Sequence, residues 1–174
     1  MCIRDRADND IYYNTKSGTS YTKGLRDFHN LFVKLKLITL VANSGDTLID
    51  YAVGKAGDIS KWIAANLSFV FGIDLSKDNI QNRMDGACAR YLNYHKRFNI
   101  IPDALFLQGN SSQNIRNLSA LNTEKGKLIA NAVFGEGPKN ETTLGKGVIK
   151  SFGKGANGFN ISSCLLYTSP SPRD

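Results

Sequence analysis

The clearest early pattern of apolar positions lies between residues 24 and 40. Four large apolar residues recur there at spacings of three, four and three, as on one face of an α-helix: Leu25, Phe28, Phe32 and Leu35. Asn30 and Lys34 are four residues apart, so they share another side of the same predicted helix. The pattern therefore predicts a helix that presents an amide and a cation together.

Further along, short apolar runs alternate with helical patterns. We expect strands at residues 47–53, 68–75 and 103–108, with a fourth beginning at 158–163. We expect helices at residues 58–67, 77–98 and 127–134, and Asp58 stands where it can cap the first of them. The remaining stretches are predicted to be connections, with a turn at 110–116 and an insertion or mobile loop at 135–158. Strands that alternate with helices predict an α/β fold with a parallel sheet.

The two ends of the chain read as one piece of DNA translated from opposite strands. Residues 1–6 can be encoded by ATG TGT ATA AGA GAC AG, and the reverse complement of that string encodes residues 164–168. Such an inverted repeat is typical of a sequencing adapter, so we expect residues 1–6 and 164–174 to be translated adapter and set them aside. Residues 7–22 are polar and are predicted to be a linker or arm, which leaves 23–163 as domain sequence.

Setting the ends aside changes the charge and the cysteine count. The ends carry three arginines and two aspartates, so removing them lowers the formal net charge from +7 by one. The remaining excess suits an anionic partner such as RNA no better than it suits an ordinary basic protein. Only Cys88 is left, so neither an internal disulfide nor a cysteine-rich metal site is expected, and we expect this thiol to be buried. No apolar run reaches the roughly 18 residues of a membrane span.

The candidate chemistry lies where the predicted strands end, which is where parallel sheets bind ligands. A glycine turn at residues 54–57 follows the first strand and leads into a helix N-terminus. Asp74 ends the second strand, where an acid can accept hydrogen bonds from both hydroxyls of a ribose. Residues 109–112 follow the third strand and could contact an adenine edge. Together these features suit S-adenosylmethionine in a class I methyltransferase, although an α/β domain whose acid only caps a helix would show the same spacing.

Five segments together resemble the mRNA cap guanine-N7 methyltransferases. The resemblance is strongest to the methyltransferase region of capping enzymes from nucleocytoplasmic large DNA viruses, and it covers residues from about 22 to 163. It implies a class I, Rossmann-like α/β methyltransferase fold that is truncated after about the fourth strand, so that residues 23–163 are the N-terminal half of the domain. The segments that carry it are 25–34, 50–62 (DYAVGKAGDISKW), 71–74, 109–112 and 158–163.

The resemblance also implies which residues hold the cofactor, S-adenosylmethionine. Lys34 matches the lysine that holds the methionine carboxylate, and Asp74 matches the ribose acid. Asn110 stands where the family has an aspartate that receives the adenine amino group, and its side-chain carbonyl could accept the same hydrogen bond. Ala52 and Ala56 each replace a family glycine. The full set implied for the cofactor is Lys34, Ala52, Gly54, Gly57, Asp74, Asn110 and Ser111.

A second set of residues is implied for the cap. Asn30 matches the first of two family asparagines near the cap, whereas Leu31 replaces the second. Lys55 and Lys61 match basic positions that face the cap and its phosphates. Arg90 matches a third basic position, although its spacing from Asp74 is longer here, so a surface role fits it equally well.

Methyl transfer to guanine N7 needs no general base, because N7 already carries a lone pair. No catalytic residue and no metal ligand are therefore expected, and positioning supplies the catalysis. The partner implied is the capped 5′ end of mRNA, with upstream triphosphatase and guanylyltransferase domains in the parent chain. The location implied is intracellular: host cytoplasm, viral factory or virion for a viral protein, otherwise the nucleus. The 174-residue chain itself is expected to be inactive.

Two other functions fit the same residues. One is a class I methyltransferase that acts on a small molecule or a protein, and a histidine–tyrosine pair soon after the fourth strand would favour the cap instead. The other is a non-catalytic, nucleotide-binding remnant that serves as an assembly surface. Binding of S-adenosylmethionine by the completed domain would count against the second of these.

Overall fold

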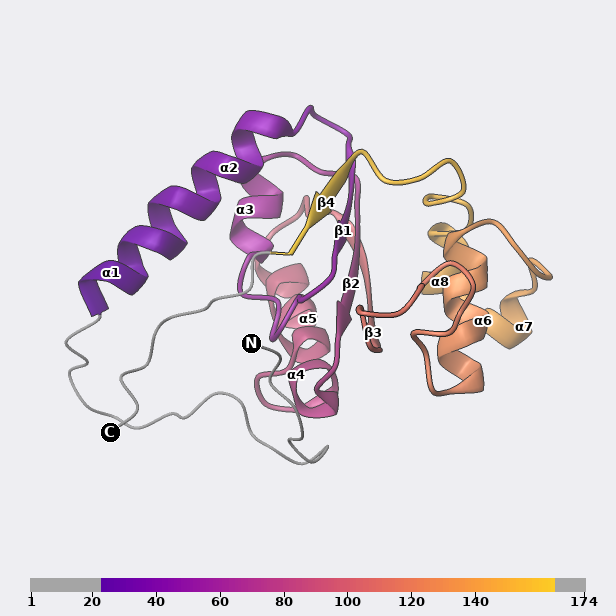
Figure 1. The fold of residues 1–174 in the computed structure, drawn as a ribbon. Coiled ribbons are helices and arrows are strands. Elements are labelled where there is room, and N and C mark those ends of the chain that lie inside the picture. Colours follow the sequence, from indigo (N-terminus) through magenta and orange to yellow (C-terminus); the bar gives the residue numbers. More distant parts are fainter. Residues whose placement is uncertain (1–22, 165–174) are drawn as a thin grey trace, which may run out of the picture.

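The computed structural model describes residues 23–164, and its centre is one sheet of four parallel strands (Figure 1). The expectations for residues 1–22 and 165–174 lie outside the described residues. The strands are β1 (Thr47–Asp50), β2 (Phe69–Asp74), β3 (Asp103–Gln108) and β4 (Ile161–Ser163), and their order across the sheet is β3-β2-β1-β4. The predicted parallel α/β sheet is confirmed, and it is consistent with a fragment of a Rossmann-like methyltransferase.

The two central strands bring their carboxyl ends to the same edge of the sheet. Asp50 at the end of β1 pairs with Gly72 of β2 and with Ser163 of β4, while Asp74 at the end of β2 pairs with Gln108 of β3. Five of the six residues of β2 are buried, as expected for a parallel strand covered on both faces. The polar ends of β1 and β2 are therefore neighbours at one edge.

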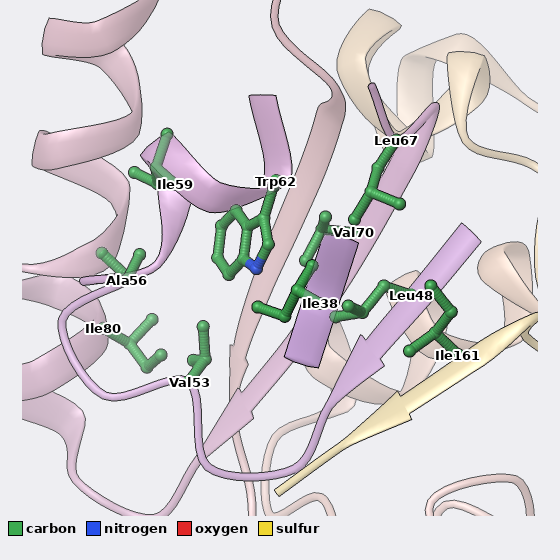
Figure 2. Close-up of a cluster of buried hydrophobic side chains, with 11 residues drawn as sticks. Ile38, Leu48, Val53, Ala56, Ile59, Trp62, Leu67, Val70, Ile80 and Ile161 are labelled. Carbon is green, nitrogen blue, oxygen red and sulfur yellow. The ribbon is translucent and has the colours of Figure 1, made fainter. Parts of the chain in front are cut away.

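Helices cover both faces of the sheet (Figure 1). One face carries α2 (Lys34–Val41), α3 (Ile59–Ala64), α4 (Lys77–Gln81) and α5 (Ala87–Arg97), and the other carries α6 (Glu124–Val133), α7 (Glu141–Leu144) and α8 (Lys146–Lys150). On the first face, Ile38 of α2 and Trp62 of α3 pack toward Val70 and Leu48 of the sheet (Figure 2). On the second, Phe71 of β2 packs edge-on against Phe134.

The predicted helix at 24–40 is continuous but not uniform. It consists of α1 (Lys23–Asp27), a π-helical segment η1 (Phe28–Val33) and α2. Three of the four residues in its apolar stripe are more than half exposed, and the residue of α2 that is buried is Ile38. The wider π turn changes the face that follows it, because each π turn takes about one residue more than an α turn.

Four predictions of local structure were wrong. The helix expected at 77–98 is interrupted between α4 and α5, where Gly86 is extended, and an added Cβ there would lie 2.7 Å from the backbone of Asn82. The loop expected at 135–158 contains α7 and α8. Asp58 does occupy the N-cap position of α3, but its side chain makes no cap hydrogen bond. Cys88 is exposed rather than buried.

Candidate functional site

The turn after β1 passes directly beside the end of β2. Gly54 and Ala56 both take left-handed backbone conformations, with φ values of 56° and 52°. This conformation costs little for glycine and more for alanine, so the fold holds Ala56 there against its preference. Ala56 is nevertheless buried, and its methyl group belongs to the apolar core beneath the turn (Figure 2). The turn thus presents its backbone at the polar edge of the sheet.

Asp74 binds the glycine turn to the end of β2. Its Oδ2 accepts a hydrogen bond from the backbone N–H of Gly54 at 2.8 Å. Its Oδ1 accepts two more, from the backbone N–H of Ser76 at 2.9 Å and from the side-chain amide of Asn79 at 3.0 Å. The acid predicted to bind a ribose is therefore at the right edge of the sheet, and three hydrogen bonds fix its carboxylate.

Asp50 is a second carboxyl group at this edge, and it is 3% exposed. Burial raises the pKa of Asp50 to about 7, against the opposing effect of a hydrogen bond from the N–H of Ala52. The negative charges of Asp58 and Asp74 raise this pKa further, while the positive charge of Lys34 lowers it. All three charges therefore lie near Asp50, so Lys34 and Asp74 flank one buried carboxyl group.

Lys34 and Lys61 share a single carboxylate. The Nζ of Lys34 lies 3.2 Å from Oδ2 of Asp58, and the Nζ of Lys61 lies 2.6 Å from Oδ1 of the same residue. The three side chains are between 7% and 13% exposed. Two ammonium groups around one carboxylate leave one net positive charge at this point, which suits an additional anion.

Lys55 lies in the glycine turn, and its side chain faces the connection between α4 and α5. Its Nζ lies 2.8 and 2.9 Å from the two carboxylate oxygens of Asp85 and 3.3 Å from Asp78. Burial lowers the pKa of Lys55, but the hydrogen bonds and charges of Asp85 and Asp78 outweigh it and raise the pKa above its ordinary value. Lys55 is thus charged and already paired with two acids.

The other residues of the predicted site are spread around this edge. Asn30 is half-buried within η1, and Arg90 is exposed in the first turns of α5, which begins two residues after Asp85. The side-chain carbonyl of Asn110 accepts hydrogen bonds from the N–H and the hydroxyl of Ser112, at 3.1 and 2.7 Å. Asn110 would have to give up one of these bonds to accept an adenine amino group, because a carbonyl has two lone pairs.

Three contributors to this edge were not identified from the sequence. Asn79 and Asp85 lie in a stretch that was expected to be one helix, so their positions relative to the glycine turn were unknown. Asp50 was noted only as part of a motif, and its burial is what gives it an unusual pKa. The spacing of Asn79, five residues after Asp74 and one helical turn past Ser76, was the only available signal.

A cavity of about 550 Å³ opens beside the loop that follows β3, and neither Lys34 nor Asp74 lines it. Its walls include Tyr51, Arg116 and Phe159. It therefore adjoins the α6 side of the sheet and carries no assignment for the cofactor.

Comparison with known proteins identifies relatives over part of the chain. A probable mRNA-capping enzyme of Acanthamoeba polyphaga mimivirus is 32% identical over 108 residues, which is 59% of this chain and 9% of that protein. An mRNA cap guanine-N(7) methyltransferase of Candida glabrata is 39% identical over 81 residues, covering 45% of this chain and 19% of its own length. This part of the chain is homologous to the mRNA cap guanine-N7 methyltransferases.

A cap guanine-N(7) methyltransferase of Oryza sativa is 38% identical over 55 residues, covering 32% of this chain and 15% of its own length. The chain spans between 9% and 20% of the length of the cap methyltransferases and capping enzymes that it matches. No protein-family model matches the chain. Within residues 23–164, no helix is long and apolar enough to cross a membrane. The same residues hold no group of three or more His, Cys, Asp or Glu side chains that could bind a metal ion.

Proposed function

We propose that residues 23–163 are the N-terminal half of a cap guanine-N7 methyltransferase domain and that the carboxyl ends of β1 and β2 bind S-adenosylmethionine. The observation that carries this proposal is the placement of Lys34 and Asp74 on either side of Asp50 at a single edge of the sheet. Such an edge is where parallel α/β sheets bind nucleotides. Homology to cap methyltransferases supports the same reading.

The side chains present fit an amino acid linked to a nucleoside. Lys34 would hold the carboxylate of the methionine part, since Asp58 alone does not balance the charges of Lys34 and Lys61. Asp74 would accept from the ribose. The backbone between Ala52 and Gly57 would lie against the cofactor, and an added Cβ at Gly57 would meet no atom within 4 Å, which is consistent with open space there. Asn110 and Ser111 would contact the adenine.

When bound, S-adenosylmethionine supplies a methyl group that is already activated by a positively charged sulfur. The protein's own contribution is therefore orientation and electrostatics rather than proton transfer. Lys34 fixes one end of the cofactor and Asp74 the other, so that the methyl group faces the base. No side chain of the chain is required to take up a proton, because guanine N7 is alkylated through its lone pair.

The cap would lie against Asn30, Lys55, Lys61 and Arg90. Lys55 and Lys61 already have carboxylate partners, so each would have to share its ammonium group with a cap phosphate. An ammonium group has three donors, which permits this sharing. Binding of the cap should accordingly weaken as salt concentration rises.

The decisive experiment measures the binding of S-adenosylhomocysteine, the stable product, to the 174-residue chain by isothermal titration calorimetry. Lys34→Met and Asp74→Asn should each weaken binding by about tenfold or more, since each removes a hydrogen bond to a charged group. Lys125→Met alters an exposed lysine of α6 and should leave binding unchanged. A chain that folds, as judged by circular dichroism, but does not bind this ligand would contradict the proposal.

A second measurement separates the cap from other methyl acceptors. The unmethylated cap analogue GpppG should bind the chain in the presence of S-adenosylhomocysteine, and Asn30→Ala should weaken that binding while leaving the binding of S-adenosylhomocysteine unchanged. Methyl transfer from S-adenosylmethionine to capped RNA is not expected from this chain alone. Measurable turnover would show that the described half is sufficient.

A further inference from the structure

The carboxylate of Asp74 is almost fully occupied before any ligand binds. Each carboxylate oxygen can accept about two hydrogen bonds. The Oδ1 of Asp74 already accepts two, from the N–H of Ser76 and from the side-chain amide of Asn79. The Oδ2 accepts one, from the N–H of Gly54. Room therefore remains for one further donor, and it lies on Oδ2.

Asn79 holds this arrangement from the first turns of α4. The residue is 5% exposed, and its own carbonyl Oδ1 is buried without a hydrogen-bond partner among residues 23–164. Turning the amide over would put two acceptor oxygens together, so Asp74 dictates its orientation. A buried carbonyl without a partner is costly, which makes the bond to Asp74 the reason for an amide at this position.

A neutral donor is also the only kind that suits this location. Asp50 and Asp58 lie close by, together with the ammonium group of Lys34. An additional cation on Asp74 would compete for its remaining acceptor site, and an additional acid would repel the carboxylate. The amide of Asn79 fixes Oδ1 without adding a charge.

We propose that Asn79 is a positioning residue that commits Oδ1 of Asp74, so that the carboxylate binds the ribose of the cofactor through a single hydroxyl on Oδ2. This inference rests on the proposed function, because it concerns how the same site binds a nucleoside. It replaces the expectation that Asp74 binds both ribose hydroxyls with a more specific one.

The first test uses S-adenosylhomocysteine and its 2′-deoxy and 3′-deoxy analogues, titrated into the 174-residue chain. One deoxy analogue should bind about tenfold more weakly than the parent compound, as expected for the loss of one hydrogen bond to a charged group. The other should bind within about threefold of the parent. Equal losses for the two analogues, or no loss for either, would overturn the inference.

The second test uses three variants. Asn79→Leu keeps a similar volume but removes the donor, so binding of S-adenosylhomocysteine should weaken about fivefold to tenfold. The loss should disappear when the deoxy analogue that lacks the bound hydroxyl is used, because Asn79 acts through that contact. Asn82→Leu removes a comparable bond on the same helix, from Asn82 to Asp78 at 2.7 Å, and should leave binding unchanged.

Asn79→Asp provides a readout that lost packing would not produce. At neutral pH the new carboxyl repels Asp74 and weakens binding. As the pH falls, the pair takes up one proton, which restores a donor to Asp74, so affinity relative to wild type should recover for Asn79→Asp and not for Asn79→Leu. No recovery would overturn the inference. Failure of the wild-type chain to bind S-adenosylhomocysteine would overturn the proposed function, whereas wild-type binding with unaffected Asn79 variants would overturn only this inference.

Discussion

Asp50 stores an unfavourable interaction at the end of β1. Its carboxyl group is buried, and its pKa is raised to about 7 from an ordinary value of 3.8. An acid of this kind binds its proton more tightly in the folded state than in the unfolded state. Its contribution to stability is therefore present below pH 4 and is lost as the pH rises from about 4 to 7. The glycine turn is thus built around a group that prefers to be neutral.

Asp50→Asn should remove this pH dependence. The amide oxygen can still accept from the N–H of Ala52, but the group can no longer ionise. We expect the variant to gain up to about 4 kcal/mol over wild type at pH 8, the free energy equivalent of roughly three pKa units, and little at pH 5. Urea unfolding at both pH values measures this difference. Asp27→Asn, on the exposed part of α1, should show no such gain, and an unchanged or less stable Asp50→Asn at pH 8 would contradict the prediction.

Asp58 should matter more for stability than either lysine that it binds. Asp58→Ala leaves the ammonium groups of Lys34 and Lys61 without this carboxylate, and uncompensated buried charges cost about 3–5 kcal/mol. Lys61→Met should cost less, because Asp58 then keeps Lys34 as its partner. Denaturant unfolding of the two variants would test this order. Equal costs would indicate that Asp58 acts only at the start of α3.

At the scale of elements, the sequence predicted the strands better than the helices. Residues 103–108 were predicted with both ends correct, because Pro102 and Gly109 bound an apolar run. The helical stretch at 77–98 was predicted without its break, since the break depends on how tightly Gly86 approaches the backbone of Asn82. A close backbone approach is a tertiary contact, and no period of apolar residues reports it.

Gly86→Ala should test that contact. The added Cβ would lie 2.7 Å from both the backbone nitrogen and the carbonyl oxygen of Asn82, so the connection between α4 and α5 must shift. We expect a loss of about 1–3 kcal/mol in the free energy of unfolding, together with weaker pairing of Lys55 with Asp85. Gly147→Ala in α8 meets no atom within 4 Å and should be neutral or stabilising by up to about 1 kcal/mol. Similar effects of the two substitutions would contradict this reading.

At the scale of the whole molecule, the candidate site could be located from the sequence but not arranged from it. The ends of parallel strands meet at one edge, so the association of Asp74 with the glycine turn followed from topology alone. The partners within that edge did not follow. Lys55 and Lys61 were expected to face a cap, and in the structure each lies against a carboxylate that its own chain supplies. Ion pairs between loops depend on side-chain directions that spacing does not encode.

The same scale explains an exposed apolar face that the helical period had drawn. Phe28 and Phe32 stack at 5.4 Å on η1, and both remain more than half exposed. Most of the exposed large apolar side chains among residues 23–164 that precede β1 lie along this one helix: Leu25, Phe28, Leu31, Phe32, Leu37, Leu40 and Val41. Apolar patches of this kind on a protein surface promote association.

We therefore expect the chain to self-associate through this helix, and Phe28→Ser with Phe32→Ser should reduce that association. Sedimentation velocity at several concentrations would show a smaller average mass for the double variant than for wild type. Met84→Ser with Leu92→Ser removes two exposed apolar side chains from α5 and the turn before it, and should change little. If both double variants reduced association equally, the cause would be exposed apolar area in general, and the helix formed by α1, η1 and α2 would have no special part in it.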